Sequence, residues 1–187
     1  WLHISLEGAP LAAAFFAYLG GAPFLGTEIY GLSSAEIGIY LSAPAVGYFV
    51  GNFLSGRFSG RVGINRMVLW GCIINGVGVL VSLIIALTGA DTFLTFFGFM
   101  CFVGLGNGMA IPNGTTGAIS VRPHLAGTAS GLSGAIMIGA GAALSAYAGF
   151  LLKPDSTAVP LLLLMFATAI AGLVAILLVI LREKKLN

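Results

Sequence analysis

Residues 159–181 read VPLLLLMFATAIAGLVAILLVIL, and this stretch decides the fold class. It contains no charged side chain, and it is long enough to cross a hydrocarbon core of roughly 30 Å, which takes about 20 apolar residues in a helix. Segments 161–165 and 175–181 do not alternate between polar and apolar residues, as the strands of a membrane barrel do. Because every backbone N–H and C=O group in lipid must be bonded internally, the stretch predicts a transmembrane α-helix.

Five further stretches share this character. The predicted spans are residues 10–29, 37–56, 67–88, 93–112, 126–152 and 159–181. The whole chain is 58% hydrophobic and 7% charged, whereas a soluble domain has roughly 25% charged residues. The sequence therefore predicts an all-α membrane protein with a single six-helix transmembrane domain over residues 1–187, in contact with the lipid bilayer.

The basic residues are distributed unevenly between the predicted loops. With six spans, both termini share one side with the second-to-third and fourth-to-fifth loops. That side holds seven of the eight basic residues: Arg57, Arg61, Arg66, Arg122, Arg182, Lys184 and Lys185. The other side holds Lys153 together with Glu36, Asp91 and Asp155. Because Lys and Arg concentrate in cytoplasmic loops, both termini are predicted to be cytoplasmic.

Several kinds of chemistry find no support in the sequence. Cys72 and Cys101 lie within spans without a partner at motif spacing, so neither a disulfide nor a zinc site is expected. We find no nucleophile triad, phosphate-cradling loop or metal-ligand cluster. We therefore expect no enzyme, catalytic residue, metal or cofactor, and no nucleic-acid partner. Because the chain begins at Trp1 without an initiator Met, we expect a fragment or a trimmed form. No signal-peptide pattern precedes the first span.

Small residues and prolines shape the predicted helices. The small residues at helical spacing are Gly47, Gly51 and Ser55; Gly104 and Gly108; Gly127 and Gly131; and Gly141, Ser145 and Gly149. Such faces let helix backbones approach closely in lipid. Helices that pack through small side chains can also slide past one another or bend, as alternating access requires. Pro23, Pro44 and Pro112 each remove one backbone hydrogen bond and can kink a span.

Residues 56–66, GRFSGRVGINR, form the loop between the second and third spans. An ordinary loop that follows the positive-inside rule would explain its arginines. The segment also resembles the signature loop of the major facilitator superfamily, which reads Gly, three residues, Asp, Arg, one residue and Gly, followed by basic residues. Gly56, Arg61, Gly63 and Arg66 match that pattern, and Gly60 stands in the place of the acid. The family repeats this loop, often in degenerate form, in its second half, so the missing carboxylate favours the second half.

Three more segments resemble the drug:proton antiporter branch of that family, the bicyclomycin-resistance (Bcr/CflA) type. Residues 22–33 are similar to the end of its seventh helix, 106–113 to the end of its tenth and 127–131 to the start of its eleventh. The resemblance implies the C-terminal half of a twelve-helix bundle in the bacterial inner membrane. It also implies an N-terminal six-helix half as partner, covalent or separate, and proton-coupled efflux of small amphipathic drugs.

Two other functions are compatible with the same pattern. A related facilitator could import a sugar or another metabolite. A membrane scaffold subunit that does not transport could bury the same polar groups against neighbouring helices, and mutating them would then lower stability without altering transport. A transporter would instead present some of these groups to a wet interior face.

Polar and adaptable side chains at membrane depth are the candidates for function. The substrate-cavity candidates are Tyr18, Asn52, Asn75, Asn107, Asn113 and Met137. A buried amide or hydroxyl costs free energy unless it is hydrogen-bonded, so each of the polar residues is expected either to pair with another helix or to line a cavity. Met137 offers a flexible apolar surface, with ordinary packing as the alternative.

Glu28 is the one acid inside a predicted span, where it lies at the outer end. An ionisable residue in the membrane is a functional hypothesis by default. Glu28 is therefore a candidate for carrying protons or for gating the outer face with Tyr30 or Tyr40. The alternative is a structural role at the end of the helix, where water solvates the carboxylate.

Overall fold

The structure is a computed structural model that describes residues 2–120, 126–153 and 156–186, with side chains from residue 12 onward except at 118, 119, 129, 184 and 186. The described chain is helical and contains no strand. Its elements are α1 (Leu2–Phe24), the π-helix η1 (Leu25–Ile29), α2 (Ser34–Tyr40), α3 (Ala43–Val62), α4 (Ile64–Leu87), α5 (Phe93–Ser120), α6 (Ala126–Leu151) and α7 (Val159–Leu186).

The prediction of an all-α membrane bundle is confirmed. Among the described residues, five segments are long and apolar enough to cross a membrane: Ser34–Val62, Ile64–Leu87, Phe93–Gly117, Ala126–Leu151 and Val159–Glu183. They lie where the last five predicted spans were placed. The first predicted span, 10–29, coincides with the second half of α1 and with η1, which are helical but do not belong to these five segments.

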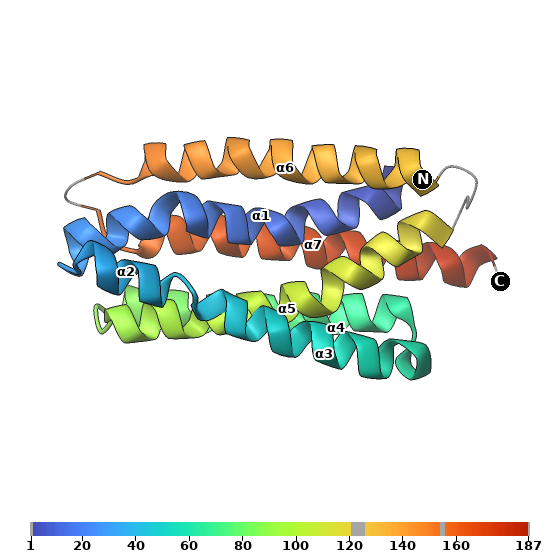
Figure 1. Ribbon diagram of the computed structural model, residues 1–187, viewed down its shortest axis with the longest axis horizontal. Coiled ribbons are helices and arrows are strands. Elements are labelled where there is room, and N and C mark those ends of the chain that lie inside the picture. The colour runs from blue at the N-terminus through green and yellow to red at the C-terminus, as the bar shows by residue number, and fades with distance from the viewer. Residues whose placement is uncertain (1, 121–125, 154–155, 187) are drawn as a thin grey trace.

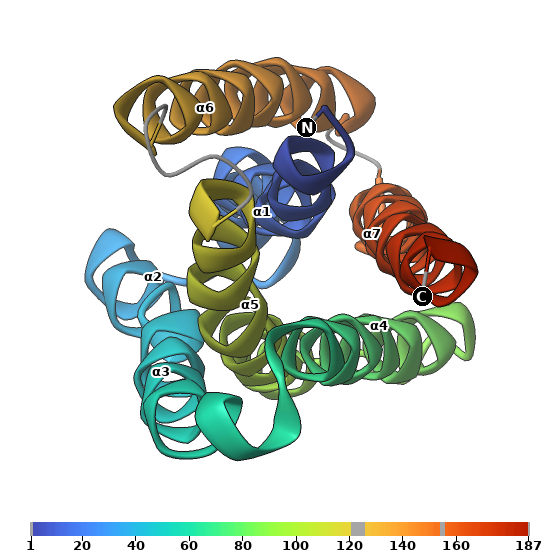
Figure 2. The same cartoon turned by 90° about the vertical axis from the view of Figure 1, so that its right-hand side faces the viewer.

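The helices pack as two groups of three. In Figure 1, α6, α1 and α7 run along one side of the bundle, and α3, α5 and α4 run along the other. In the end view of Figure 2, α1 and α5 lie nearest the centre of the bundle. Contacts of α1 with α5 and of α4 with α7 join the two groups. The start of α1, the α3–α4 junction and the end of α7 lie at one end, which we call the Gly63 end. We call the opposite end, with η1 and the α4–α5 turn, the Tyr30 end.

The second predicted span is divided into α2 and α3. Ser33 caps α2, because its hydroxyl accepts from the Glu36 N–H while the Glu36 carboxylate accepts from the Ser33 N–H at 2.8 Å. The break follows from Pro44, which has no N–H to donate to the carbonyl of Tyr40. That carbonyl instead faces the hydroxyl of Tyr18 at 3.5 Å. Pro112, in contrast, lies inside the continuous helix α5.

The α3–α5 contact brings two backbones together. A Cβ atom on Gly47 would collide with the carbonyl oxygen of Cys101, and one on Gly104 would collide with that of Pro44. The close packing predicted for these glycines is therefore confirmed. On α6, a Cβ on Gly141 would collide with the ring of Phe16, whereas one on Gly131 would meet nothing within 4 Å in the described part of the chain.

Candidate functional site

A cavity of about 340 Å³, which we call the Asn107 cavity, opens between α1, α3, α5 and α6. Its wall is mostly apolar and includes Phe15 and Phe16 from α1 and Ile111 from α5. Tyr48 from α3, Asn107 from α5 and Met137 from α6 also line it. Among the described residues, no charged side chain borders it. A mostly apolar wall with a few polar groups is typical of a site for a small organic molecule.

Asn107 gives this wall its amide. It projects from α5, is 3% exposed, and accepts a hydrogen bond at Oδ1 from Nδ2 of Asn75 on α4 at 3.2 Å. Asn75 is fully buried behind it and does not border the cavity. The Oδ1 atom of Asn75 has no hydrogen-bond partner in the described structure. Nδ2 of Asn107 likewise donates to no described group, and Asn107 as a residue lines the cavity.

The other two predicted amides lie elsewhere. Asn113 is almost fully buried and donates to Oγ of Ser55 at 2.8 Å and to the carbonyl of Met109 at 2.6 Å. Asn52 is half-buried and donates to the carbonyl of Tyr48, one turn earlier in its own helix, at 2.8 Å. The structure therefore does not gather the four amides at one site, and of the four only Asn107 borders the Asn107 cavity.

The two remaining cavity candidates also separate. Met137 is half-buried and borders the Asn107 cavity from α6. Tyr18 is fully buried, and its ring lies against Phe96 and Phe97 with centroid separations of 6.1 and 6.2 Å. Tyr18 thus belongs to the aromatic core, beside the broken second span, rather than to the cavity wall.

Glu28 lies on η1 with an exposed side chain. The nearby polar contact is made by Tyr30, which donates to the carboxylate of Asp91 at 3.0 Å. Burial raises the pKa of Tyr30 above its ordinary value, and the hydrogen bond to Asp91 raises it further. Tyr30 was expected to act with Glu28. In the structure, its hydroxyl is hydrogen-bonded to Asp91, an acid of the α4–α5 turn. The sequence analysis did not find this pairing, because the two residues are 61 positions apart and no sequence pattern links them.

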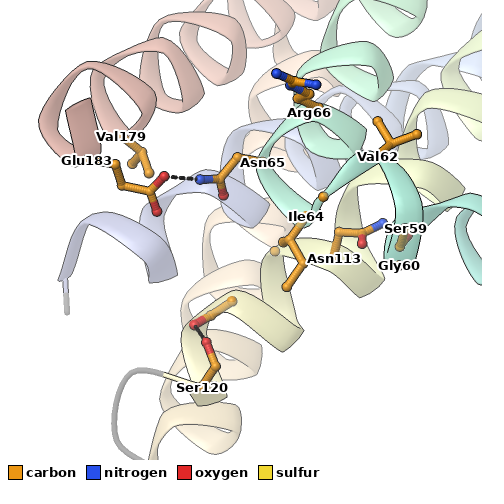
Figure 3. Close-up of a pocket in the computed structure, with 13 residues that line it drawn as sticks. Ser59, Gly60, Val62, Ile64, Asn65, Arg66, Asn113, Ser120, Val179 and Glu183 are labelled. Carbon is orange, nitrogen blue, oxygen red and sulfur yellow. Dashed lines mark hydrogen bonds between the residues drawn. The ribbon is translucent and has the colours of Figure 1, made fainter. Parts of the chain in front are cut away.

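The signature-like loop borders a second cavity of about 650 Å³, which we call the Gly63 pocket (Figure 3). Gly63 ends α3 with φ of 91°, a value that L side chains rarely adopt, and α4 begins at the next residue. Asn65 donates to the Glu183 carboxylate at 2.6 Å and so joins α4 to α7. Arg66 and Asn113 also border the pocket.

Gly56 and Arg61, the other two residues that match the signature, do not line this pocket, whereas their loop neighbours Ser59, Gly60, Val62 and Ile64 do. Gly56 and Arg61 lie on α3, and both are exposed. A Cβ atom on Gly56 would meet nothing within 4 Å in the described part of the chain. Arg122 and Asp155, used above for orientation, lie outside the described residues, as does the side chain of Lys184.

The helices are long and apolar enough to cross a membrane, and no described charged side chain borders the cavity between them. These features define a multi-pass membrane protein. The chain belongs to the Major Facilitator Superfamily, a family of transporters, whose sequence model matches residues 9–187.

Two relatives indicate how much of such a protein the chain represents. The "Uncharacterized MFS-type transporter YdgK" of Bacillus subtilis (strain 168) is 29% identical over 163 residues, which cover 86% of this chain and 39% of the relative. The "Bicyclomycin resistance protein homolog" of Haemophilus influenzae is 26% identical over 180 residues, which cover 94% of this chain and 44% of the relative. The chain thus spans about two fifths of the length of the curated relatives it matches.

Proposed function

We propose that the chain is the C-terminal half of a proton-coupled exporter of small amphipathic molecules and forms one wall of its substrate cavity. The observation that carries this proposal is the Asn107 cavity, with its apolar and aromatic wall and one amide whose nitrogen donates to no described residue. A wall of this kind binds by shape and apolar contact and so tolerates varied substrates. The name of the Haemophilus influenzae relative, a bicyclomycin resistance homolog, supports a drug as substrate.

The proposed N-terminal half would pack against the faces that α3 and α6 leave uncovered. Phe49 and Phe53 on α3 are 76% and 67% exposed, and Ile138 and Phe150 on α6 are 62% and 79% exposed. These two helices also border the Asn107 cavity. A second half seated on them would close the cavity from the side. The proposed partner is therefore the segment that accounts for the extra length of the relatives.

Proton coupling is proposed to depend chiefly on that other half. Among the described residues, no acidic side chain borders the Asn107 cavity, so this wall offers no group to exchange a proton beside the substrate. Glu28 remains the candidate of this chain, at an exposed position on η1. It would contribute by gating or by proton entry at the Tyr30 end.

The proposed orientation places the Gly63 end in the cytoplasm. Arg57, Arg61 and Arg66 are exposed on the helices that meet there, as are Arg182 and Lys185 near the end of α7. Glu28, Glu36 and Lys153 are exposed at the Tyr30 end, and Glu183 is the exposed acid near the end of α7. This charge distribution favours a cytoplasmic Gly63 end under the positive-inside rule.

The test is energised efflux of the neutral dye Nile red from bacterial cells that express the chain with or without a related N-terminal half. Each measurement is repeated with a protonophore. Efflux that needs both halves and stops with the protonophore would support the proposal. Efflux from the chain alone would indicate that two copies assemble. Folded protein in the membrane without efflux in any arm would count against export and favour uptake or a scaffold.

A further inference from the structure

Asn107 lines the cavity and uses one end of its amide for a hydrogen bond within the protein. Its Oδ1 atom accepts from Asn75, whereas its Nδ2 atom has no acceptor among the described residues. Asn107 as a residue is 3% exposed, and an amide nitrogen at such a position is stabilised by an acceptor. A molecule in the cavity would supply that acceptor.

The direction of the amide follows from the surroundings of Asn75. In the observed arrangement, the carbonyl oxygen of Asn75 and one of its two N–H groups have no partner among the described residues. If both amides were reversed, the carbonyl oxygen would be paired but both N–H groups of Asn75 would be unpaired, and an orphaned N–H is rarer in protein interiors than an unused carbonyl. The observed direction is therefore the less costly one, and it leaves the Nδ2 donor of Asn107 without a partner among the described residues.

Asn75 is held in place by close packing of α4 against α5. A Cβ atom on Gly106 would lie 2.8 Å from Cβ of Asn75, and one on Gly71 would lie 3.0 Å from Cβ of Ala110. The backbones of α4 and α5 therefore lie in contact at Asn75, which keeps this residue beside Asn107. A partner held beside an amide by packing helps to fix the orientation of that amide.

We propose that Asn107 is a specificity-determining residue that donates from Nδ2 to an uncharged acceptor oxygen on the substrate, and that Asn75 is the positioning residue behind it. This inference rests on the proposed function of the cavity. The acceptor is a carbonyl, ether or hydroxyl oxygen attached to an apolar or aromatic body. A carboxylate or phosphate would lack a cationic partner on this wall and would be costly to bury.

The test uses two fluorescent probes that differ in one group. Prodan is a neutral naphthalene ketone, and its matched analogue carries propyl in place of the propionyl group. Saturable binding of each is measured with the purified full-length transporter that contains this chain, in detergent micelles, with protein-free micelles subtracted. One neutral hydrogen bond predicts about a three- to tenfold preference for prodan. The emission of bound prodan should also be red-shifted, since its carbonyl accepts a hydrogen bond.

The variants separate positioning from packing. Asn107→Leu should abolish the preference and shift the emission of bound prodan to the blue. Asn75→Leu should reduce the preference to about twofold, because the freed amide can turn away. Asn75→Asp should retain it, since a buried neutral carboxyl group still donates one O–H to Asn107. Asn52→Leu is the matched control, since Asn52 bonds within its own helix, and it should leave the preference unchanged.

Each outcome decides between the two proposals. A wild-type protein that binds both probes equally, or a preference that survives in Asn107→Leu, would overturn the role of Asn107 and leave the cavity as a binding site. If Asn107→Leu does not fold, unshifted emission of prodan bound to the wild type would overturn that role equally. The lack of saturable binding of either probe to folded wild-type protein would overturn the cavity proposal, and the role of Asn107 with it.

Discussion

Tyr30 donates its phenolic hydrogen to the carboxylate of Asp91 at 3.0 Å and thereby ties η1 to the turn between α4 and α5. The contact joins the two groups of helices at the Tyr30 end. Asn65 and Glu183 join them at the Gly63 end, at 2.6 Å. At each end of the bundle, a hydrogen bond thus connects one group of helices to the other.

Tyr30→Phe should lower the free energy of unfolding by about 1–2 kcal/mol, since it removes a donor from a charged acceptor in a half-buried contact. Unfolding by SDS in mixed micelles would measure the change. Tyr147→Phe provides the control, because Tyr147 is 51% exposed on α6 and makes no hydrogen bond in the described part of the chain. Equal stabilities of the two variants would show that the contact with Asp91 contributes nothing.

The same tyrosine predicts a dependence of stability on alkaline pH. The pKa of Tyr30 is raised in the folded protein by burial and by Asp91, whereas an unfolded tyrosine ionises near pH 10. The folded state therefore holds this proton more tightly, and its contribution to stability is complete below about pH 10 and is lost as pH rises further. Stability measured between about pH 9 and 11 should fall less steeply in Tyr30→Phe than in the wild type. Parallel curves would contradict the prediction.

Gly104→Ala should destabilise the bundle by about 1–3 kcal/mol, because the added methyl group would meet the backbone of Pro44, which cannot move as a side chain does. Gly98→Ala on the same helix is the control, since a Cβ there meets nothing within 4 Å in the described structure. The free energy of unfolding of Gly98→Ala should differ from that of the wild type by less than about 0.5 kcal/mol. Thermal unfolding in detergent compares the pair, and similar losses in both would exclude a specific α3–α5 contact as the cause.

Gly63→Ala should cost about 1–3 kcal/mol because residue 63 adopts φ of 91° and ψ of 148°, a region essentially confined to glycine. Gly60→Ala, in a helical and open position of the same loop region, should cost nothing measurable. Denaturation by SDS measures both. A tolerant Gly63→Ala would show that the α3–α4 junction can adopt another conformation.

The sequence predicted the helices well because lipid leaves few alternatives. An apolar stretch such as 159–181 has to satisfy its backbone internally, so the helix α7 begins at Val159 as expected. The predicted kinking effect of Pro44 also has a direct cause in its missing N–H and appears as the break between α2 and α3. The π-helix η1 was not predicted, because no residue type in 25–29 requires one.

The rotation of each helix about its axis was beyond the reach of the sequence. In a soluble helix, the apolar face shows which side is buried. Here nearly every face is apolar, so nothing distinguishes Asn52, which bonds its own helix, from Asn107, which meets Asn75 across a helix contact. Which amide borders a cavity depends on how α3, α4 and α5 pack against one another at their glycines.

Pro112 lies in α5 between Asn107 on one cavity and Asn113 on the other. At 1.5 Å per residue, these amides are about 9 Å apart along the helix axis, and the carbonyl of Gly108 has no helical donor between them because Pro112 lacks an N–H. A ligand that bends α5 at Pro112 would therefore change the volumes of the Asn107 cavity and the Gly63 pocket together. By thermodynamic reciprocity, occupation of either cavity would then alter the affinity of the other by the same factor.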